Sequence, residues 1–343
     1  MIGYSRNISL LPYNTFGVDV KASHFFHLKS SDQLHEFLDF PGFKEISGDL
    51  RQMLVLGQGS NILFTGDFDG VVIRNEIDGI NIIAEDDSSV TLEAGAGVTW
   101  NDLVDYAADR NWWGIENLAL IPGTVGAAPV QNIGAYGVEA ADVIVRVTAF
   151  NLETGQWMVL ENSACGFGYR DSIFKRSLKH KAVICSVVFR LSKTAEPRLE
   201  YSGVREELGA RGISEPSARD VADAVAAIRR SKLPDPQFLG NGGSFFKNPL
   251  VSESVCQRLK GDYPLMPVHR QGDLYKIPAG WLIEKAGWKG YRSGNVGCYE
   301  KQSLILVNYG NATGREILDL SDRIAESVSL MFGIELEKEV NVI

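Results

Sequence analysis

The chain has 343 residues, of which 45% are hydrophobic, so it can bury a large core and should divide into two or three domains. Its 34 basic and 43 acidic residues give a net charge of −9, and no basic run could follow a phosphate backbone, which argues against a nucleic-acid partner. The four cysteines form no C-x-x-C pair, which argues against a metal site, and we expect their thiols to be reduced. No segment reaches the ~18 apolar residues of a spanning helix, so we expect a cytoplasmic protein with no membrane partner.

The first part of the chain alternates strand-like runs with glycine turns. An apolar run over 52–56 is followed by the loop Gly57-Gln58-Gly59-Ser60-Asn61, and further strands are predicted over 62–64 and 71–73. A Rossmann dinucleotide fold would need a helix directly after a G-x-G-x-x-G loop. Neither feature is present, so this loop belongs to a different fold.

A strand over 90–94 and an amphipathic helix over 99–110 come next. Thr99 is predicted to cap this helix, with Asp102 three residues further on. Trp112 and Trp113 follow the helix and are predicted to anchor the core.

The segment Ile121 to Gly137 contains four glycines, three alanines and two prolines in 17 residues. Because the side chains of this segment are small, its backbone is expected to be the contact surface. Such a surface would suit a flat or phosphorylated ligand bound by main-chain N–H groups. The alternative, tight internal packing of small residues, stays open.

Two strands over 143–150 and 182–191 flank the polar segment Gly168 to Phe174. Arg170 could pair with Asp171 on a surface turn, or sit partly buried and bind a carboxylate with its planar fork of donors. A helix over 217–230, with Ser217 as its cap and Asp220 at the third position, then leads to Arg229, Arg230 and Lys232. It is stopped by Leu233-Pro234-Asp235-Pro236.

The segment Gly242-Gly243-Ser244-Phe245-Phe246-Lys247-Asn248-Pro249 places one hydroxyl on a backbone that few residues other than glycine could form. An ordinary tight turn would account for the octapeptide alone.

The last third has the alternation of an α+β domain. Helices are predicted over 252–260 and 279–286, and a strand over 303–308. Thr313 to Glu316 forms a capping box that opens a helix stopped by Gly333, with apolar positions at 317, 320, 324, 328 and 331. A strand over 334–340 should follow, with Glu335 and Glu337 on its exposed face.

Six motifs in this order resemble the UDP-N-acetylenolpyruvoylglucosamine reductases, from Asn14-Thr15-Phe16-Gly17 to Val340. They are Gly57 to Asn61, Ile121 to Gly137, Gly168 to Phe174, Lys232 to Pro236, Gly243 to Pro249 and Leu336 to Val340. Tyr201 matches the tyrosine loop of the family's longer subclass. Ser202-Gly203 departs from the glycine-aspartate expected after that tyrosine.

The resemblance implies an α+β protein with a two-part FAD-binding region of the vanillyl-alcohol-oxidase type and a C-terminal substrate domain. The implied domains are residues 1–76 completed by a C-terminal strand over 334–343, residues 77–232, and the substrate domain over 233–333. FAD would be bound non-covalently, NADPH would donate hydride, and UDP-N-acetylglucosamine enolpyruvate would be the substrate. We expect a monomer, although no pattern in the sequence fixes the oligomeric state.

The resemblance also implies roles for single residues. Hydride addition to the enolpyruvyl group develops negative charge, which Arg170 would stabilise with Glu339 beside it, and Ser244 would donate the proton, helped by Lys247 or water. Substrate contacts would come from Tyr169, Tyr201, Lys232, Asn248, Lys289 and Gln302. Cofactor contacts would come from Gly57, Gln58, Gly59, Ser60, Asn61, Ile121, Pro122, Gly123, Thr124, Gly126, Ala127, Gln131, Asn132, Gly134, Ala135, Tyr136, Gly137 and Arg229.

Two other functions are considered as alternatives, and the residues of the chain bear on each. A flavin oxidase of the same fold often carries a histidine tether to FAD, but none of the five histidines lies in either glycine-rich stretch. A silent UDP-sugar or flavin-binding module should lack Arg170, Ser244 or Glu339, and all three are present.

Overall fold

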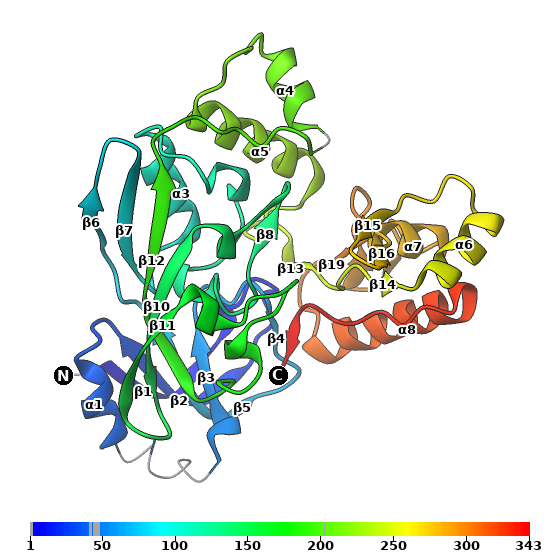
Figure 1. The fold of residues 1–343 in the computed structure, drawn as a ribbon. Helices are drawn as coiled ribbons and strands as arrows, with labels where there is room; N and C mark the ends of the chain where they lie inside the picture. The colour runs from blue at the N-terminus through cyan, green and yellow to red at the C-terminus, as the bar shows by residue number, and fades with distance from the viewer. Residues whose placement is uncertain (1–2, 41–42, 44–48, 202) are drawn as a thin grey trace. The chain divides into compact units, whose positions relative to one another are not determined.

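The computed structural model describes residues 3–40, 43, 49–201 and 203–343, and these form two compact units. Among the described residues, the first unit comprises residues 3–8, 22–58 and 68–231, and the second comprises 9–21, 59–67 and 232–343. Helices and strands are mixed in both units, as the α+β prediction requires (Figure 1).

Apart from a two-stranded hairpin, the described part of the first unit contains two sheets. The smaller has the order β1-β2-β5-β3, in which β5 (Phe68–Asn75) pairs in parallel with β2 (Lys21–Leu28) and with β3 (Met53–Leu56); β1 is Gly3–Ser9. The larger is antiparallel, in the order β11 (Gln156–Glu161), β10 (Ile144–Asn151), β12 (Ala182–Ser192), β7 (Ser89–Gly95) and β6 (Ile80–Glu85). The strands predicted over 90–94, 143–150 and 182–191 are therefore confirmed.

The main core of this unit lies around the larger sheet and α3 (Trp100–Ala108). Trp100 is fully buried, its ring centroid lies 5.9 Å from that of Phe189 on β12, and its Nε1 donates to the carbonyl of Leu118 at 3.0 Å. Trp112 and Trp113 are also buried in this core, as predicted. Thr99 occupies the N-cap of α3, but its side chain makes no capping hydrogen bond. Its Oγ1 instead accepts a hydrogen bond from Gln58, so the predicted N-cap position is confirmed but the capping hydrogen bond is not made.

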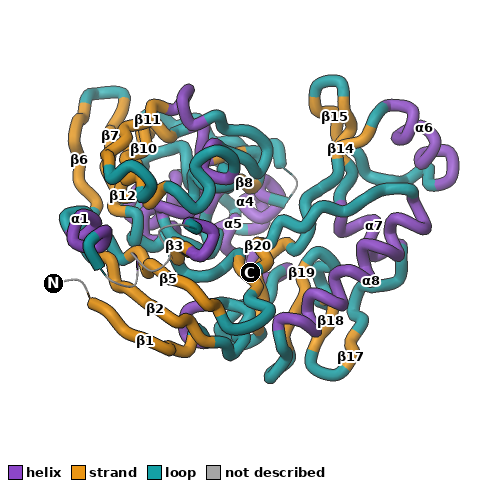
Figure 2. The backbone as a smooth tube through the Cα atoms, turned by 90° about the horizontal axis from the view of Figure 1, so that it is seen from below, coloured by secondary structure: helices purple, strands orange, loops and turns teal. Residues whose placement is uncertain are grey.

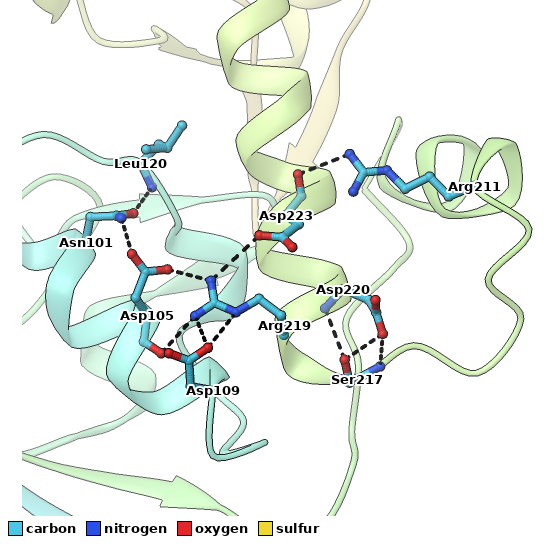
Figure 3. A network of polar contacts seen from close by, with 9 residues as sticks. All are labelled: Asn101, Asp105, Asp109, Leu120, Arg211, Ser217, Arg219, Asp220 and Asp223. Carbon is cyan, nitrogen blue, oxygen red and sulfur yellow. Dashed lines mark hydrogen bonds and ion pairs between the residues drawn. The ribbon is translucent and has the colours of Figure 1, made fainter.

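An ion-pair network joins α5 (Ala218–Lys232) to α3 (Figure 3). Arg219 Nη1 lies 2.6 Å from Asp105 Oδ1, and its Nη2 lies 2.7 Å from Asp109 Oδ1. Ser217 and Asp220 cap the helix reciprocally, because the Ser217 amide donates to Asp220 Oδ2 and the Asp220 amide donates to Ser217 Oγ. The helix ends at Lys232, before the predicted proline stop. The described part of this unit also contains the helices α1 (Gln33–Leu38) and α4 (Val204–Ala210).

The second unit has a four-stranded sheet in the order β13 (Gly240–Ser244), β19 (Ile305–Asn308), β18 (Val296–Cys298) and β17 (Arg292–Ser293). A small sheet has the order β14 (Leu250–Val251), β16 (Leu274–Lys276) and β15 (His269–Gln271). The helices are α6 (Glu253–Asp262), α7 (Ala279–Lys285) and α8 (Gly314–Phe332).

The long helix α8 contacts β18, β19 and α7 (Figure 2). Thr313 and Glu316 form the predicted capping box, and Gly333 ends the helix with a φ of 67°. Ile317, Leu320, Ile324 and Val328 are buried as expected. Met331 is 50% exposed and Phe332 is buried, so the last predicted apolar position is wrong.

The final residues pair with a segment far away in the sequence. β20 (Asn341–Val342) is parallel to β4 (Ile62–Leu63), and the amide and hydroxyl of Thr65 both donate to the carbonyl of Ile343. Before β20, pairing is limited to a bridge between Lys338 and Phe246, so the strand predicted over 334–340 is wrong in its extent. Its alternation holds nevertheless, because Ile334 and Leu336 are buried while Glu335 and Glu337 are exposed. None of the helices among the described residues has both the length and the apolar character needed to cross a membrane.

Candidate active site

The glycine loop after β3 and the small-residue segment contact each other inside the first unit. Gln58 Oε1 accepts a hydrogen bond from the Gly123 amide at 2.9 Å, and Gln58 Nε2 donates to Thr99 Oγ1 at 3.2 Å. A Cβ atom added to Gly57 would lie 2.6 Å from Thr124 Oγ1. Gly57 and Gln58 therefore join the two stretches that the sequence singles out as cofactor-binding.

The small-residue segment uses several of its own amides inside the protein. The Val125 amide donates to Val98, the Gly126 amide to Ala96, and the Ala127 amide to Thr124. With the Gly123 amide held by Gln58, the expectation that this part of the segment offers a row of main-chain donors to a phosphate is wrong. A Cβ atom on Gly126 would come within 2.6 Å of the Ala96 Cβ, so this glycine is required for close packing.

Arg229 provides a donor that suits an anionic cofactor. Within the part of the chain that the structure describes, its Nε is buried and has no hydrogen-bond acceptor. Burial lowers the pKa of Arg229, and the positive charge of Arg170 acts in the same direction, whereas Tyr136 acts against it. A desolvated guanidinium needs an anion, and a phosphate of FAD would meet this need. On this observation the residues fit the cofactor that the resemblance implies.

Arg170 is positioned by main-chain carbonyls. Its Nη2 donates to the Gly134 carbonyl at 2.6 Å, and its Nη1 donates to the Asn132 carbonyl at 3.5 Å. Its guanidinium also lies 5.6 Å from the ring centroid of Tyr169. Asp171 lies 3.4 Å from Arg176. The surface pairing of Arg170 with Asp171 is therefore not what the structure shows, and the partial burial predicted for Arg170 is confirmed, while its binding of a carboxylate stays a prediction.

Tyr201 is 51% exposed, and its ring lies edge-on to that of Tyr136, with centroids 5.5 Å apart. Asn117, which the sequence does not single out, is fully buried and donates from Nδ2 to the carbonyls of Tyr136 and Arg198. It thereby ties the small-residue segment to the chain that leads to Tyr201. Ser202, where the chain departs from the family pattern, lies outside the described residues.

Ser244 lies in the second unit, at the end of β13. Gly243 has a φ of 71°, and a Cβ atom on Gly242 would lie 2.4 Å from the ring of Phe16, so both glycines are required. Ser244 is exposed, whereas the next two residues, Phe245 and Phe246, are buried. The turn therefore fixes the backbone and leaves the hydroxyl accessible.

Glu339 lies beside this turn. Its amide donates to the Phe245 carbonyl at 2.8 Å, and Asn61 Nδ2 donates to the Glu339 carbonyl at 3.3 Å. The structure thus brings Glu339 and Asn61 to the chain that carries Ser244. Lys247, expected to assist Ser244, donates from Nζ to Glu337 instead.

Two of the four expected substrate-binding residues of the second unit meet at the start of α7. Asn248 Oδ1 accepts a hydrogen bond from the Ala279 amide at 2.9 Å, and a Cβ atom on Gly280 would lie 2.9 Å from Gln302 Oε1. Lys289 follows the other end of α7 and donates to Glu284 at 3.0 Å. Lys232 is exposed at the end of α5.

The expected residues are distributed over both units. The first unit contains Gly57, Gln58, the segment from Ile121 to Gly137, Tyr169, Arg170, Tyr201 and Arg229. The second unit contains Gly59, Ser60, Asn61, Lys232, Ser244, Asn248, Lys289, Gln302 and Glu339.

Comparison with known proteins gives two family matches and several full-length relatives. Residues 24–161 match the FAD binding domain, and residues 235–343 match the C-terminal domain of UDP-N-acetylenolpyruvoylglucosamine reductase. The chain is 46% identical to the UDP-N-acetylenolpyruvoylglucosamine reductase of Flavobacterium johnsoniae over 98% of each chain. It is 43% identical to that of Pseudomonas putida over 99% of each chain.

One solved structure extends the comparison to the fold. The crystal structure of UDP-N-acetylenolpyruvylglucosamine reductase from Thermus caldophilus superimposes with a TM-score of 0.67 and 24% identity, covering 100% of this chain and 98% of that one. Together with the FAD-binding match, it confirms an α+β fold with an FAD-binding domain.

Proposed function

Because the chain belongs to the UDP-N-acetylenolpyruvoylglucosamine reductase family, we propose that it reduces UDP-N-acetylglucosamine enolpyruvate to UDP-N-acetylmuramate, a step of peptidoglycan precursor synthesis. The protein is an oxidoreductase that uses FAD and NADPH. The observation that carries this function is the 46% identity to a named reductase along 98% of both chains.

When bound, FAD would supply to the terminal carbon of the enolpyruvyl group a hydride that originates from NADPH. This addition moves negative charge toward the substrate carboxylate, where preorganised donors stabilise it. Arg170 is proposed to bind that carboxylate, because its guanidinium is already oriented by the carbonyls of Asn132 and Gly134. Glu339 is proposed to orient the Arg170 guanidinium or to share a proton with the substrate carboxylate.

The remaining carbon of the substrate must receive a proton. Ser244 is the proposed donor, since its hydroxyl is exposed on a backbone that two glycines and two buried phenylalanines hold in place. A serine hydroxyl is a weak acid and needs a neighbouring donor or water to stabilise the alkoxide. Lys247 or bound water is the proposed partner, although the Nζ of Lys247 donates to Glu337 in this structure.

The substrate and cofactor contacts implied by the resemblance are kept as proposals. Lys232, Lys289 and Tyr201 would contact the diphosphate and uridine, together with Tyr169, Asn248 and Gln302. The cofactor would contact the loop from Gly57 to Asn61, the segment from Ile121 to Gly137, and Arg229. The proposed domains are residues 1–76 with 334–343, residues 77–232 and residues 233–333. We also propose that the protein is a monomer and that it is located in the cytoplasm, where buried free thiols such as those of this chain are common.

An anaerobic titration tests the proposal. The purified protein should be yellow and should release intact FAD on denaturation. NADPH should bleach the flavin absorbance without oxygen, and the UDP-sugar enolpyruvyl ether should restore it. Rapid recovery of the colour in air without this substrate would favour a flavin oxidase, and a colourless protein that FAD cannot reconstitute would contradict the proposal.

A further inference from the structure

The turn that carries Arg170 has an unfavourable backbone conformation. Gly168 and Asp171 exchange two main-chain hydrogen bonds, of 3.0 and 3.2 Å, so Tyr169 and Arg170 are the central residues of a four-residue turn. Arg170 has a φ of 53°, a conformation that glycine adopts readily and other residues rarely do. Such a conformation persists only where the surroundings enforce it, and it is common at functional sites.

Asn132 holds this turn from the neighbouring segment. Its side chain is 1% exposed, and its Nδ2 donates to the Gly168 carbonyl at 3.1 Å. Its Oδ1 accepts a hydrogen bond from the Ala141 amide at 2.9 Å, and its main-chain carbonyl accepts one from Arg170. One buried residue therefore contacts both the base of the turn and the guanidinium.

Glu139 in turn fixes Asn132. Glu139 Oε2 accepts the second hydrogen bond of Asn132 Nδ2, at 2.7 Å. Glu139 is also paired with Gly134 in the hairpin formed by β8 (Gly134–Ala135) and β9 (Val138–Glu139), and Gly134 gives the other carbonyl that binds Arg170. Both carbonyls that orient the guanidinium thus belong to residues that Glu139 contacts.

Gly134 leaves room for both Glu139 and Arg170. A Cβ atom on Gly134 would lie 3.0 Å from Glu139 Cγ and 3.1 Å from Arg170 Nη1. Both neighbours would have to shift to accept a larger residue. The absence of a side chain at this position therefore lets the carboxylate stem and the guanidinium approach the same strand.

We infer that Glu139 is a positioning residue for Arg170, acting through its hydrogen bond to Asn132 and through its pairing with Gly134. The inference rests on the proposed function, because it takes Arg170 as the group that binds the substrate carboxylate. Glu139 itself is not assigned a contact with substrate or cofactor. Its effect is to keep the guanidinium in the geometry that the developing charge requires.

The test measures each half-reaction by stopped-flow absorbance in the FAD-loaded protein. Glu139→Ala should slow reoxidation of the flavin by substrate by about tenfold or more, because a small displacement of a positioned group has effects of this size. Flavin reduction by NADPH and FAD content should stay unchanged. Glu139→Gln keeps an acceptor for Asn132 and should be near wild type, whereas Glu139→Asp falls short of Asn132 and should resemble Glu139→Ala. Glu215→Ala, which removes an exposed carboxylate of the same unit, is the matched control.

A second arm separates this inference from the proposed function. Arg170→Ala should slow reoxidation by about 10²-fold or more, the scale of a lost charge-stabilising donor, and Glu139→Ala should add nothing in that background. If Arg170→Ala leaves reoxidation unchanged, the role proposed for Arg170 is wrong. If Arg170→Ala is slow but Glu139→Ala is silent, or if the two effects add, the positioning role of Glu139 is overturned. A Glu139→Gln protein as slow as Glu139→Ala would also overturn it, because charge rather than the hydrogen bond would then matter.

Discussion

At the scale of single residues, Ser244 combines a fixed backbone with an exposed hydroxyl. Ser244→Ala should leave flavin reduction by NADPH nearly intact and slow flavin reoxidation by substrate by ~10²-fold or more, the scale of a positioned acid. Stopped-flow absorbance measures the two rates separately. Ser293→Ala, an exposed serine of the same sheet, is the control and should change neither rate. Equal slowing of both half-reactions by Ser244→Ala would mean that the serine shapes the flavin site instead.

The buried cysteines give a prediction on pH. Burial raises the pKa of Cys165 to about 11 and those of Cys185 and Cys298 to about 12, from an ordinary value of 9.0. Above pH 9 the unfolded chain loses these thiol protons while the folded chain keeps them, so the free energy of unfolding should fall as the pH rises from 9 to about 12. Urea denaturation at pH 8 and pH 10 measures this change.

The same burial predicts inert thiols in the native protein. At pH 8 the folded chain should not react with a chromogenic disulfide reagent, whereas the urea-unfolded chain should react at all four cysteines. Rapid modification of one thiol in the native protein would contradict the burial described for that position.

At the scale of elements, the network of Figure 3 fixes α5 to α3. Arg219 contacts Asp105 and Asp109, and its side chain is 31% exposed. Arg219→Ala should lower the free energy of unfolding by about 1 kcal/mol, the upper end for partly exposed pairs, and the loss should shrink in high salt. Arg219→Lys should restore little of it, because lysine lacks the planar fork that reaches both carboxylates. Urea denaturation at two salt concentrations decides this, and a loss independent of salt would point to packing of the arginine stem.

The sequence predicts the elements that local pattern determines. The capping box at Thr313, the reciprocal cap at Ser217 and the strands with continuous apolar runs all occur as expected. Thr99 stands at the predicted N-cap but makes no capping hydrogen bond; its hydroxyl accepts one from Gln58, 41 residues away, and no local pattern contains that contact. The strand over 334–340 fails because pairing depends on a partner strand, and alternation alone indicates only which side chains are buried.

The residues of the candidate site also differ in whether local sequence predicts them. Gly243 and Ser244 are recognisable because positive φ and a bare backbone have a residue signature. Glu139 and Asn117 are not recognisable, since their roles come from hydrogen bonds to distant carbonyls. The sequence contains one signal for the position of Glu139, which is the pair Tyr136-Gly137. These two residues, with φ values of 48° and 78°, form the tight turn of a hairpin, and this hairpin pairs Gly134 with Glu139.

At the scale of the whole molecule, the two units are assembled from interleaved parts of the chain. Residues 9–21 and 59–67 belong with the C-terminal third, while the segments on either side of them belong to the first unit. Composition along the sequence does not reveal this interleaving of segments, because the interleaving depends on pairing between segments hundreds of residues apart. The three-domain division of the family stays a prediction for this chain.

Binding of the substrate gives a prediction for Lys232 and Tyr201, the two residues proposed to contact its diphosphate. Lys232→Ala should weaken binding of the UDP-sugar substrate by ~1.5–3 kcal/mol through loss of a charge-assisted contact, and Tyr201→Phe by ~0.5–1.5 kcal/mol through loss of a neutral hydrogen bond. Calorimetric titration of the oxidised protein measures both, with FAD content as the control. If Tyr201→Phe is the more damaging, or if Lys232→Ala empties the protein of flavin, the assignment of these residues to the diphosphate is wrong.

The pairing of β20 with β4 has a consequence for how the chain reaches its native state during synthesis. Residues 62–65 leave the ribosome early, but their partners at 341–343 follow only after some 280 further residues, a delay on the order of half a minute at about 10 residues per second. The first unit has all its segments once residue 231 has emerged, so it can fold while translation continues. The second unit must wait, and until its last residues arrive the strand at 62–63 has an unsatisfied edge that other nascent chains could pair with.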